Sequence, residues 1–155
     1  MISINSYEGK NNKRKIKELE KKCGINFTEE YKEFLGKYNG GSAEPNTIEL
    51  PNTRILSFSI TSFYGICEEA INDLFQTLQI YEGRIPPKCI PIAETEGGNL
   101  LCLNLGQERH GCIYYWDHDE ELDYDIGEIR IENLYYVAAS FKEFLTDFQN
   151  NTRCK

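Results

Sequence analysis

The fold is decided by Ile90-Pro-Ile-Ala-Glu-Thr-Glu-Gly-Gly-Asn-Leu-Leu-Cys-Leu-Asn-Leu105 and, after a polar turn, by Gly111-Cys-Ile-Tyr-Tyr-Trp-Asp-His-Asp119. These residues predict strands over 90–93, 99–105 and 112–116, because branched and aromatic side chains suit a pleated surface. The glycines between them supply turns, so an antiparallel meander is expected. The segment contains no recognisable set of catalytic groups, and this absence favours a binding protein.

Helical periodicity surrounds this meander. Large apolar side chains recur at i, i+3, i+4 and i+7 in three segments, Tyr31–Tyr38, Ile71–Leu78 and Phe141–Phe148, and each predicts a helix with one core-facing stripe. Thr28 before two glutamates predicts the start of the first helix, and Asn39-Gly40-Gly41 predicts its end. Ser140 with Glu143 has the spacing of a capping box.

A shorter basic helix is predicted over about 12–23, with Ile16, Leu19 and Cys23 inward and Gly24 as its stop. Two further strands are predicted over 47–50 and 54–60. Because strands and helices do not alternate along the chain, the expected class is α+β: a single mostly antiparallel sheet with helices packed around it. Residues 1–155 are expected to form one domain, since no linker or repeat interrupts them.

Composition indicates a globular protein. Of the 155 residues, 27% are charged and 40% belong to the hydrophobic set, proportions typical of such chains. No apolar run approaches the roughly 20 residues that cross a bilayer, and the first residues do not resemble a signal peptide. We therefore expect a cytoplasmic protein without a membrane partner.

The net charge of -8 is unevenly distributed. Basic residues gather near the N-terminus at Lys10, Lys13, Arg14, Lys15, Lys17, Lys21 and Lys22. Acidic residues gather later at Asp117, Asp119, Glu120, Glu121, Asp123, Asp125, Glu128 and Glu132. Phosphate backbones repel an acidic protein, so nucleic acid is not an expected partner and a basic protein is. The plainer reading is that acidity keeps the chain in solution.

The six cysteines form no Cys-x-x-Cys pair. Cys102 and Cys112 alternate with apolar neighbours, so reduced and mostly buried thiols are expected. Only two histidines are present, and the spacings offer no paired zinc ligands. No metal or other cofactor is predicted.

The acidic segment has the spacing of a calcium loop. Asp117, Asp119, Glu121, Asp123, Asp125 and Glu128 occupy the ligand positions of an EF-hand. Leu122 stands where that loop requires glycine, and a strand rather than a helix precedes it. The remaining readings are a solvated acidic loop and, as the preferred one, a contact surface for a basic partner.

Acid–base catalysis is the alternative use of these carboxylates. Hydrolases hold such groups in a cleft that perturbs their pKa values, and a crowded acidic loop beside His118 does not supply one. His110 lies in a polar turn and is expected to be exposed, while Gly97-Gly98-Asn99 reads as a tight turn rather than a phosphate loop. An enzyme is therefore not predicted.

The aromatic residues of the last meander strand divide between its faces. Tyr114 and Trp116 share one side, and Tyr115 takes the other. One set must belong to the core, and the other is open to a role as interface anchors; the pattern does not say which. Tyr135 and Tyr136 precede the final helix.

Four ordered motifs resemble the SUKH superfamily, whose members are related to the yeast cell-wall glucan synthesis regulator. They are Tyr31-Lys-Glu-Phe-Leu-x-x-Tyr-Asn-Gly-Gly41, Ile90-Pro-Ile-Ala with Gly98-Asn-Leu-Leu-Cys-Leu, Ile113-Tyr-Tyr-Trp-Asp-His-Asp119 and Val137-Ala-x-Ser-Phe-x-Glu-Phe-Leu145. The likeness covers roughly Ile16 to Phe148. It implies an α+β fold without catalytic residues, and for many bacterial members an immunity role, in which the protein binds and blocks a cognate toxin, often a nuclease.

The resemblance also implies structural roles. Gly97 and Gly98 would form the turn into the central strand, while Trp116 would pack and Asp117 would hold the following turn. The acidic segment and the basic first helix depart from the family pattern.

The leading hypothesis is an immunity protein that presents an acidic face to a toxin. The candidate contact residues are Asp117, Asp119, Glu120, Glu121, Asp123 and Asp125. A regulator or scaffold of an endogenous complex is the second hypothesis, and an enzyme using a divalent ion at the acidic loop is the third.

Overall fold

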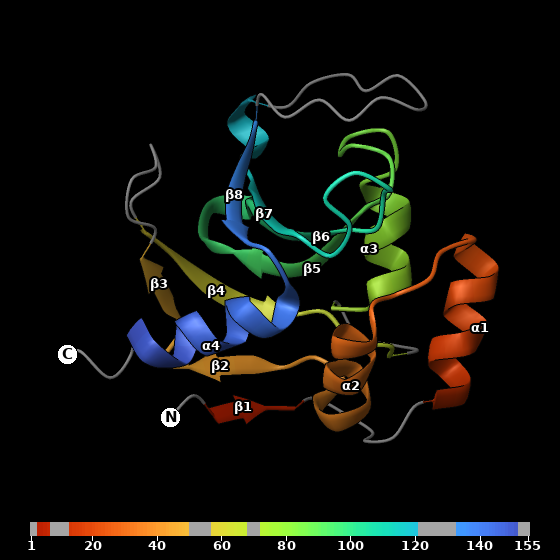
Figure 1. The fold of residues 1–155 in the computed structure, drawn as a ribbon, viewed down its shortest axis with the longest axis horizontal. Coiled ribbons are helices and arrows are strands. Elements are labelled where there is room, and N and C mark those ends of the chain that lie inside the picture. Colours follow the sequence, from red (N-terminus) through yellow and green to blue (C-terminus); the bar gives the residue numbers. More distant parts are fainter. Residues whose placement is uncertain (1–2, 7–12, 50–56, 68–71, 121–132, 152–155) are drawn as a thin grey trace.

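A curled antiparallel sheet of six strands, in the order β3-β4-β5-β6-β7-β8, forms the centre of the computed structural model (Figure 1). The structure describes residues 3–6, 13–49, 57–67, 72–120 and 133–151. The strands are β3 (Thr47–Glu49), β4 (Ser57–Phe63), β5 (Cys89–Thr95), β6 (Leu100–Asn104), β7 (Ile113–Trp116) and β8 (Leu134–Ala138). The predicted meander and the α+β class are both confirmed.

Three strands were not predicted from sequence. β8 pairs with β7, placing Leu134 opposite Trp116. β1 (Ser3–Asn5) pairs with β2 (Ser42–Glu44) in a separate two-stranded sheet. The short β1 and β2 carry little periodic signal, and a bridge from Gly41 to Phe63 of β4 connects β2 to the large sheet. The predicted strands at 47–50 and 54–60 run into residues 50–56, which lie outside the described part.

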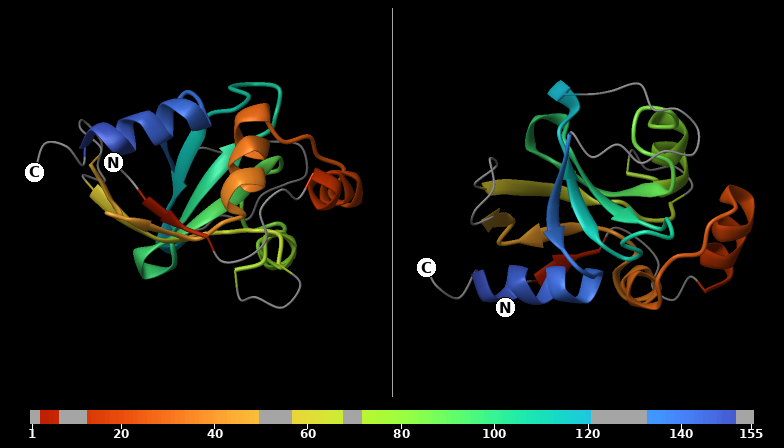
Figure 2. Two further views of the ribbon diagram at one scale, coloured as in Figure 1. Left: turned by 90° about the horizontal axis from the view of Figure 1, so that it is seen from below. Right: turned by 45° about the horizontal axis from the view of Figure 1, so that its top comes forward.

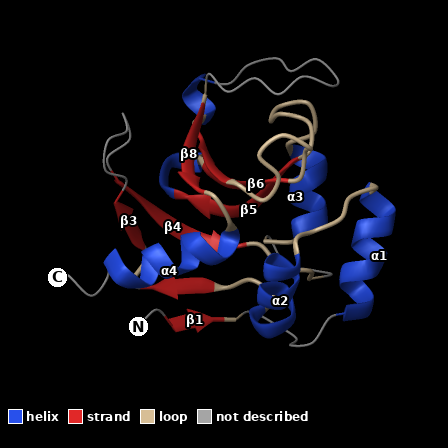
Figure 3. Cartoon of the chain, in the orientation of Figure 1, coloured by secondary structure: helices blue, strands red, loops and turns tan. Residues whose placement is uncertain are grey.

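The described residues form four α-helices (Figure 3): α1 (Lys13–Cys23), α2 (Glu29–Tyr38), α3 (Leu74–Ile80) and α4 (Phe141–Asn151). The predicted boundary signals are confirmed for α2, where Thr28 Oγ1 accepts a hydrogen bond from the Tyr31 amide and Asn39 adopts a left-handed conformation. Ser140 Oγ likewise accepts from the Glu143 amide, 3.0 Å away. α3 begins at Leu74, because the Asp73 carboxylate before it accepts a hydrogen bond from the Gln76 amide. Ile71, the first residue of the predicted stripe, lies outside the described residues.

Aromatic rings fill the space between the sheet and the helices α2 and α4. Phe34 of α2 packs 5.0 Å from Phe63 of β4 and 5.0 Å from Phe141 of α4, measured between ring centroids. Tyr31 contacts Phe141 edge to face. Figure 2 shows α2 and α4 on one side of the curled sheet and α3 on the other. α4 contacts both edge strands, β3 and β8, so it spans the concave side.

Both faces of β7 are buried, and neither aromatic set of this strand is exposed. Tyr115 packs against Phe58 with 4.8 Å between centroids, whereas Trp116 packs against Tyr81, after α3, at 5.8 Å. A role for either set as exposed anchors is therefore wrong, because helices cover the sheet on both sides. Tyr136 of β8 remains 47% exposed.

The thiols follow the predicted burial. Cys67, Cys89, Cys102 and Cys112 are buried and Cys23 is half-buried, all as free thiols, while Cys154 lies outside the described residues. None of the described helices combines the length and the apolar character needed to cross a bilayer.

Candidate functional site

The described residues of the predicted acidic segment lie where β7 ends. We call Asp117, Asp119 and Glu120 the acidic corner. It comprises the residue after β7 and the 3-10 turn η2 (His118–Glu120), and Figure 1 places it at the top of the molecule, far from α1. The Asp119 side chain is 81% exposed. The corner thus presents charge to solvent at the end of a fully buried strand.

Asp117 connects this turn to β8. Its Oδ1 accepts a hydrogen bond from the Asp119 amide at 3.0 Å. Its backbone amide donates to the Asn133 carbonyl at 3.1 Å, and Asn133 Nδ2 donates to the Asp117 carbonyl at 3.3 Å. Such side-chain bonds to nearby amides fix a turn in one conformation. Hydrogen bonds to backbone groups, rather than repulsion among the carboxylates, therefore fix the conformation of the acidic corner.

Asn99 supports the corner from the neighbouring β5–β6 turn. Its Oδ1 accepts from the His118 amide at 2.9 Å and lies beside the imidazole Nδ1, while its Nδ2 donates to the Tyr115 hydroxyl at 2.7 Å. Gly97 and Gly98, immediately before it, have φ angles of 74° and 83°, a region that L side chains rarely adopt. The turn therefore places the Asn99 amide group beneath η2.

Glu120 is held by a second tyrosine. The Tyr135 hydroxyl donates to Glu120 Oε2 at 3.1 Å. Sequence reasoning assigned no contact to Tyr135 or Asn99. The sequence contains no signal for either contact, because each joins residues from segments that are separated along the chain.

Asp117, His118 and Asp119 offer ligand atoms within 4.8 Å of one another, so the grouping could hold a divalent cation in principle. His118 Nε2 lies 3.4 Å from Asp119 Oδ1. The Asp119 carboxylate is exposed, and the electrostatic attraction between charged groups is weak where water surrounds them. The grouping is open to solvent at Asp119 rather than enclosed in a cleft.

Only part of the predicted acidic segment can be placed. The structure brings together Asp117, Asp119 and Glu120. Glu121, Asp123, Asp125 and Glu128 lie outside the described residues. Trp116, 0% exposed, anchors the strand from which the corner projects.

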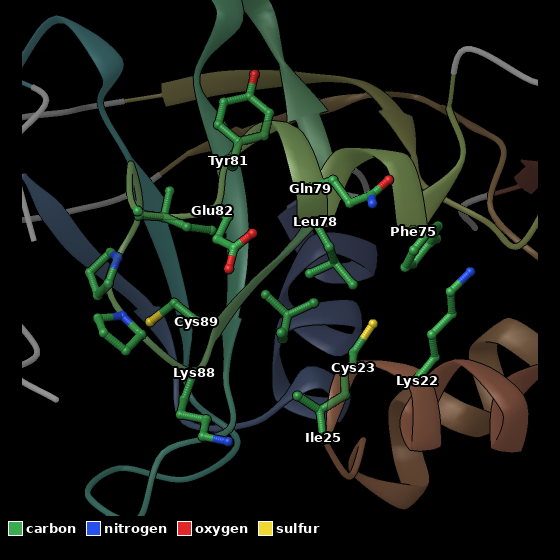
Figure 4. A pocket seen from close by; sticks show the side chains of 15 residues that line it. Lys22, Cys23, Ile25, Phe75, Leu78, Gln79, Tyr81, Glu82, Lys88 and Cys89 are labelled. Carbon is green, nitrogen blue, oxygen red and sulfur yellow. The ribbon is translucent and has the colours of Figure 1, made fainter. Parts of the chain in front are cut away.

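Sequence reasoning did not identify a cleft between α1, α3 and the start of β5, with a volume of about 490 Å³ (Figure 4). It is lined by Lys22, Cys23, Ile25, Phe75, Leu78, Gln79, Tyr81, Glu82, Gly83, Ile85, Pro86, Pro87, Lys88, Cys89 and Ile90. Burial raises the pKa of the Cys89 thiol to about 12. Burial also raises the pKa of Cys23, against an opposing effect of Lys22. Both thiols are thus poor nucleophiles near neutral pH.

Comparison with known proteins finds relatives over most of the chain. Residues 10–147 match the model of the SMI1 / KNR4 family (SUKH-1). An SPbeta prophage-derived uncharacterized protein of Bacillus subtilis (strain 168), YokK, is 29% identical over 164 residues, covering 93% of this chain and 78% of the relative.

Proposed function

Because this chain belongs to the SMI1 / KNR4 family (SUKH-1), we propose that it is a non-enzymatic binding protein, and specifically an immunity protein that neutralises a cognate toxin by direct contact. The family membership supports protein binding in general. The name of the Bacillus subtilis relative assigns no partner. The class of the partner is therefore inferred from charge.

The acidic corner is the proposed contact surface. A nuclease toxin binds phosphates through basic side chains, and carboxylates held in a fixed arrangement would bind the same side chains. Opposite charges also accelerate the encounter of two proteins. The net charge of -8 acts in the same direction for the molecule as a whole.

The observation that carries the proposal is the combination of exposure and fixation at the corner. Asp119 is exposed, yet its backbone amide is bonded to Asp117, and the amide of His118 is bonded to Asn99. A surface that is already ordered loses little conformational entropy on binding. These described residues would form the rigid base of the contact, and Glu121, Asp123 and Asp125 are proposed to extend it.

The test begins with capture of toxin domains from the same organism by the purified protein, followed by rescue of cells that express the captured toxin. Association rates are then measured for Asp119→Lys combined with Glu120→Lys. Glu44→Lys, an exposed position on β2, is a control with a change of the same sign. We expect the double variant to associate about tenfold more slowly at low salt, with a weaker dependence on ionic strength.

The results separate two failures. If the double variant and Glu44→Lys associate equally fast, the acidic corner is not the contact surface. If no toxin is captured and no cell is rescued, the immunity role itself is wrong. Calorimetry with calcium, magnesium and manganese tests the grouping of Asp117, His118 and Asp119, and a stoichiometric signal would favour a metal-dependent role instead.

A regulator or scaffold is the second candidate function. It is favoured by a cleft whose lining residues do not include those of the acidic corner (Figure 4), since a scaffold engages more than one partner. Capture of endogenous proteins in cells that lack any toxin would support this role over immunity.

A further inference from the structure

The cleft between α1 and α3, named here the α1–α3 cleft, has an apolar floor and cationic ends. Leu78 of α3 and Ile25, after α1, face each other across it, and Cys89 forms part of its base (Figure 4). Lys22 and Lys88 come from opposite sides, the first from α1 and the second from the residue before β5. A volume of about 490 Å³ accommodates one or two bulky side chains.

Both amines are held by neutral groups. Lys22 Nζ lies 3.7 Å from the centroid of the Phe75 ring, a cation–π contact. Lys88 Nζ lies 3.5 Å from the Gly24 carbonyl oxygen. Among the described residues, neither amine belongs to an ion pair. Each therefore retains the capacity to bind a carboxylate brought by a ligand.

We propose that the α1–α3 cleft binds a segment of a partner polypeptide in which a bulky apolar side chain stands between carboxylates. The apolar side chain would enter between Leu78 and Ile25, displacing water from the floor. The flanking Asp or Glu side chains would pair with Lys22 at one end and Lys88 at the other. Two cations separated by an apolar floor fit a segment with two carboxylates better than they fit a fatty acid, which has a single carboxylate.

Glu82 allows the effect of charge on binding at this cleft to be tested in the opposite direction from the lysines. It is exposed, follows α3 and lines the same cleft. Its carboxylate would repel an acidic segment while leaving the apolar floor unchanged. Removal of this charge should therefore tighten binding, whereas removal of either lysine should weaken it.

The probe is a fluorescein-labelled peptide, Gly-Glu-Trp-Glu-Gly, titrated with the full-length protein and followed by fluorescence anisotropy. The comparison peptides replace both glutamates by glutamine or the tryptophan by alanine. We expect both replacements to weaken binding. Decanoate serves as the competing small amphiphile, and displacement of the peptide by equimolar decanoate would overturn the choice of a polypeptide.

The protein variants are Lys22→Gln with Lys88→Gln, and Glu82→Gln alone. Two partly exposed ion pairs together contribute about 1.4 kcal/mol, or a factor of about ten. We therefore expect the double lysine variant to bind the probe about tenfold more weakly and Glu82→Gln to bind it about twofold more tightly. Lys15→Gln, an exposed α1 position that does not line the cleft, is the matched control.

Cys23 provides a reading of location that does not depend on affinity. It is the half-buried thiol of the cleft, whereas the other thiols of the described residues are buried. Alkylation by N-ethylmaleimide, located by mass spectrometry, should slow at Cys23 when the peptide is bound. Equal affinities for Lys15→Gln and the double lysine variant, or unchanged alkylation at Cys23, would overturn the proposal. Neither result depends on the captured toxin, so this inference and the immunity role fail separately.

Discussion

The acidic corner and the α1–α3 cleft, the two proposed binding surfaces, are built differently. The corner exposes carboxylates on a turn fixed by Asn99 and Asn133. The cleft covers its floor with apolar side chains, and its charged lining residues are Lys22, Lys88 and Glu82. Exposed charges act over about 10 Å at 0.1 M salt, whereas apolar burial acts only on contact. In the proposed roles, the corner would steer a partner toward the protein and the cleft would retain it.

Trp116 connects the two regions. Its backbone leads directly into Asp117, and its ring packs against Tyr81, which lines the cleft. The indole is fully buried, and its Nε1 has no hydrogen-bond partner among the described residues. The two surfaces therefore share one structural anchor.

The largest effect is expected for Trp116→Ala, at about 3–5 kcal/mol of unfolding free energy, because a large buried ring leaves a cavity. Urea denaturation measures the loss, and binding at both surfaces should weaken. Trp116→Phe should lose far less, because it retains the ring contact and removes an unpaired buried N–H. Tyr136→Ala, at a half-exposed neighbour, is the control. Loss of binding at only one surface would show that the regions do not share this anchor.

The next largest effect is the dependence of stability on pH, which distinguishes Cys89 at the floor of the cleft from Cys23 at its wall. Cys89 keeps its proton in the folded state because its pKa is about 12, while the unfolded thiol loses it near pH 8.5. Above that pH the unfolded chain binds fewer protons. Stability should therefore fall with rising pH, by up to about 1.4 kcal/mol per unit until about pH 12. This contribution is fully present below the unfolded pKa.

Urea denaturation from pH 8 to pH 11 measures this slope. Cys89→Ala should unfold with a shallower pH dependence than the unchanged protein. Cys23→Ala should change the slope less, because the Cys23 thiol is only half-buried. Equal slopes for all three proteins would contradict the burial of Cys89 as the cause.

Asn99→Ala should cost about 1–3 kcal/mol, because the partly buried amide of His118 and the Tyr115 hydroxyl lose their partner. The effect should be confined to the acidic corner. Hydrogen exchange should accelerate at the His118 and Asp119 amides, while the cleft peptide binds as before. A matching loss of peptide affinity would show that the two regions are coupled through β6.

The smallest effect is expected on α1. Glu18→Gln removes an exposed ion pair with Arg14, whose atoms lie 2.9 Å apart, and should cost less than about 0.5 kcal/mol. Ile16 and Leu19 hold this wall of the cleft instead. Thermal unfolding measures this loss. A loss larger than predicted would show that surface charges, rather than the buried Ile16 and Leu19, hold α1 in place.

Local signals in the chain were sufficient for many elements of the fold. Thr28 and Asn39 marked the two ends of α2, and the stripe beginning at Phe141 marked α4. β8 was not predicted, because its half-buried residues Tyr135 and Val137 show no clear alternation. The aromatic pattern of β7 showed that its side chains alternate, but not that both faces would be covered.

The sequence by itself determined the α+β class, the meander, the family and the concentration of negative charge after β7. Each depends on residues close together in the chain, where periodicity and turn chemistry act. Tertiary structure alone decided that Asn99 supports His118 and that Lys22, Leu78 and Lys88 surround one cleft. Those contacts join segments far apart in sequence, and their geometry follows from how the helices pack on a curled sheet rather than from any local preference.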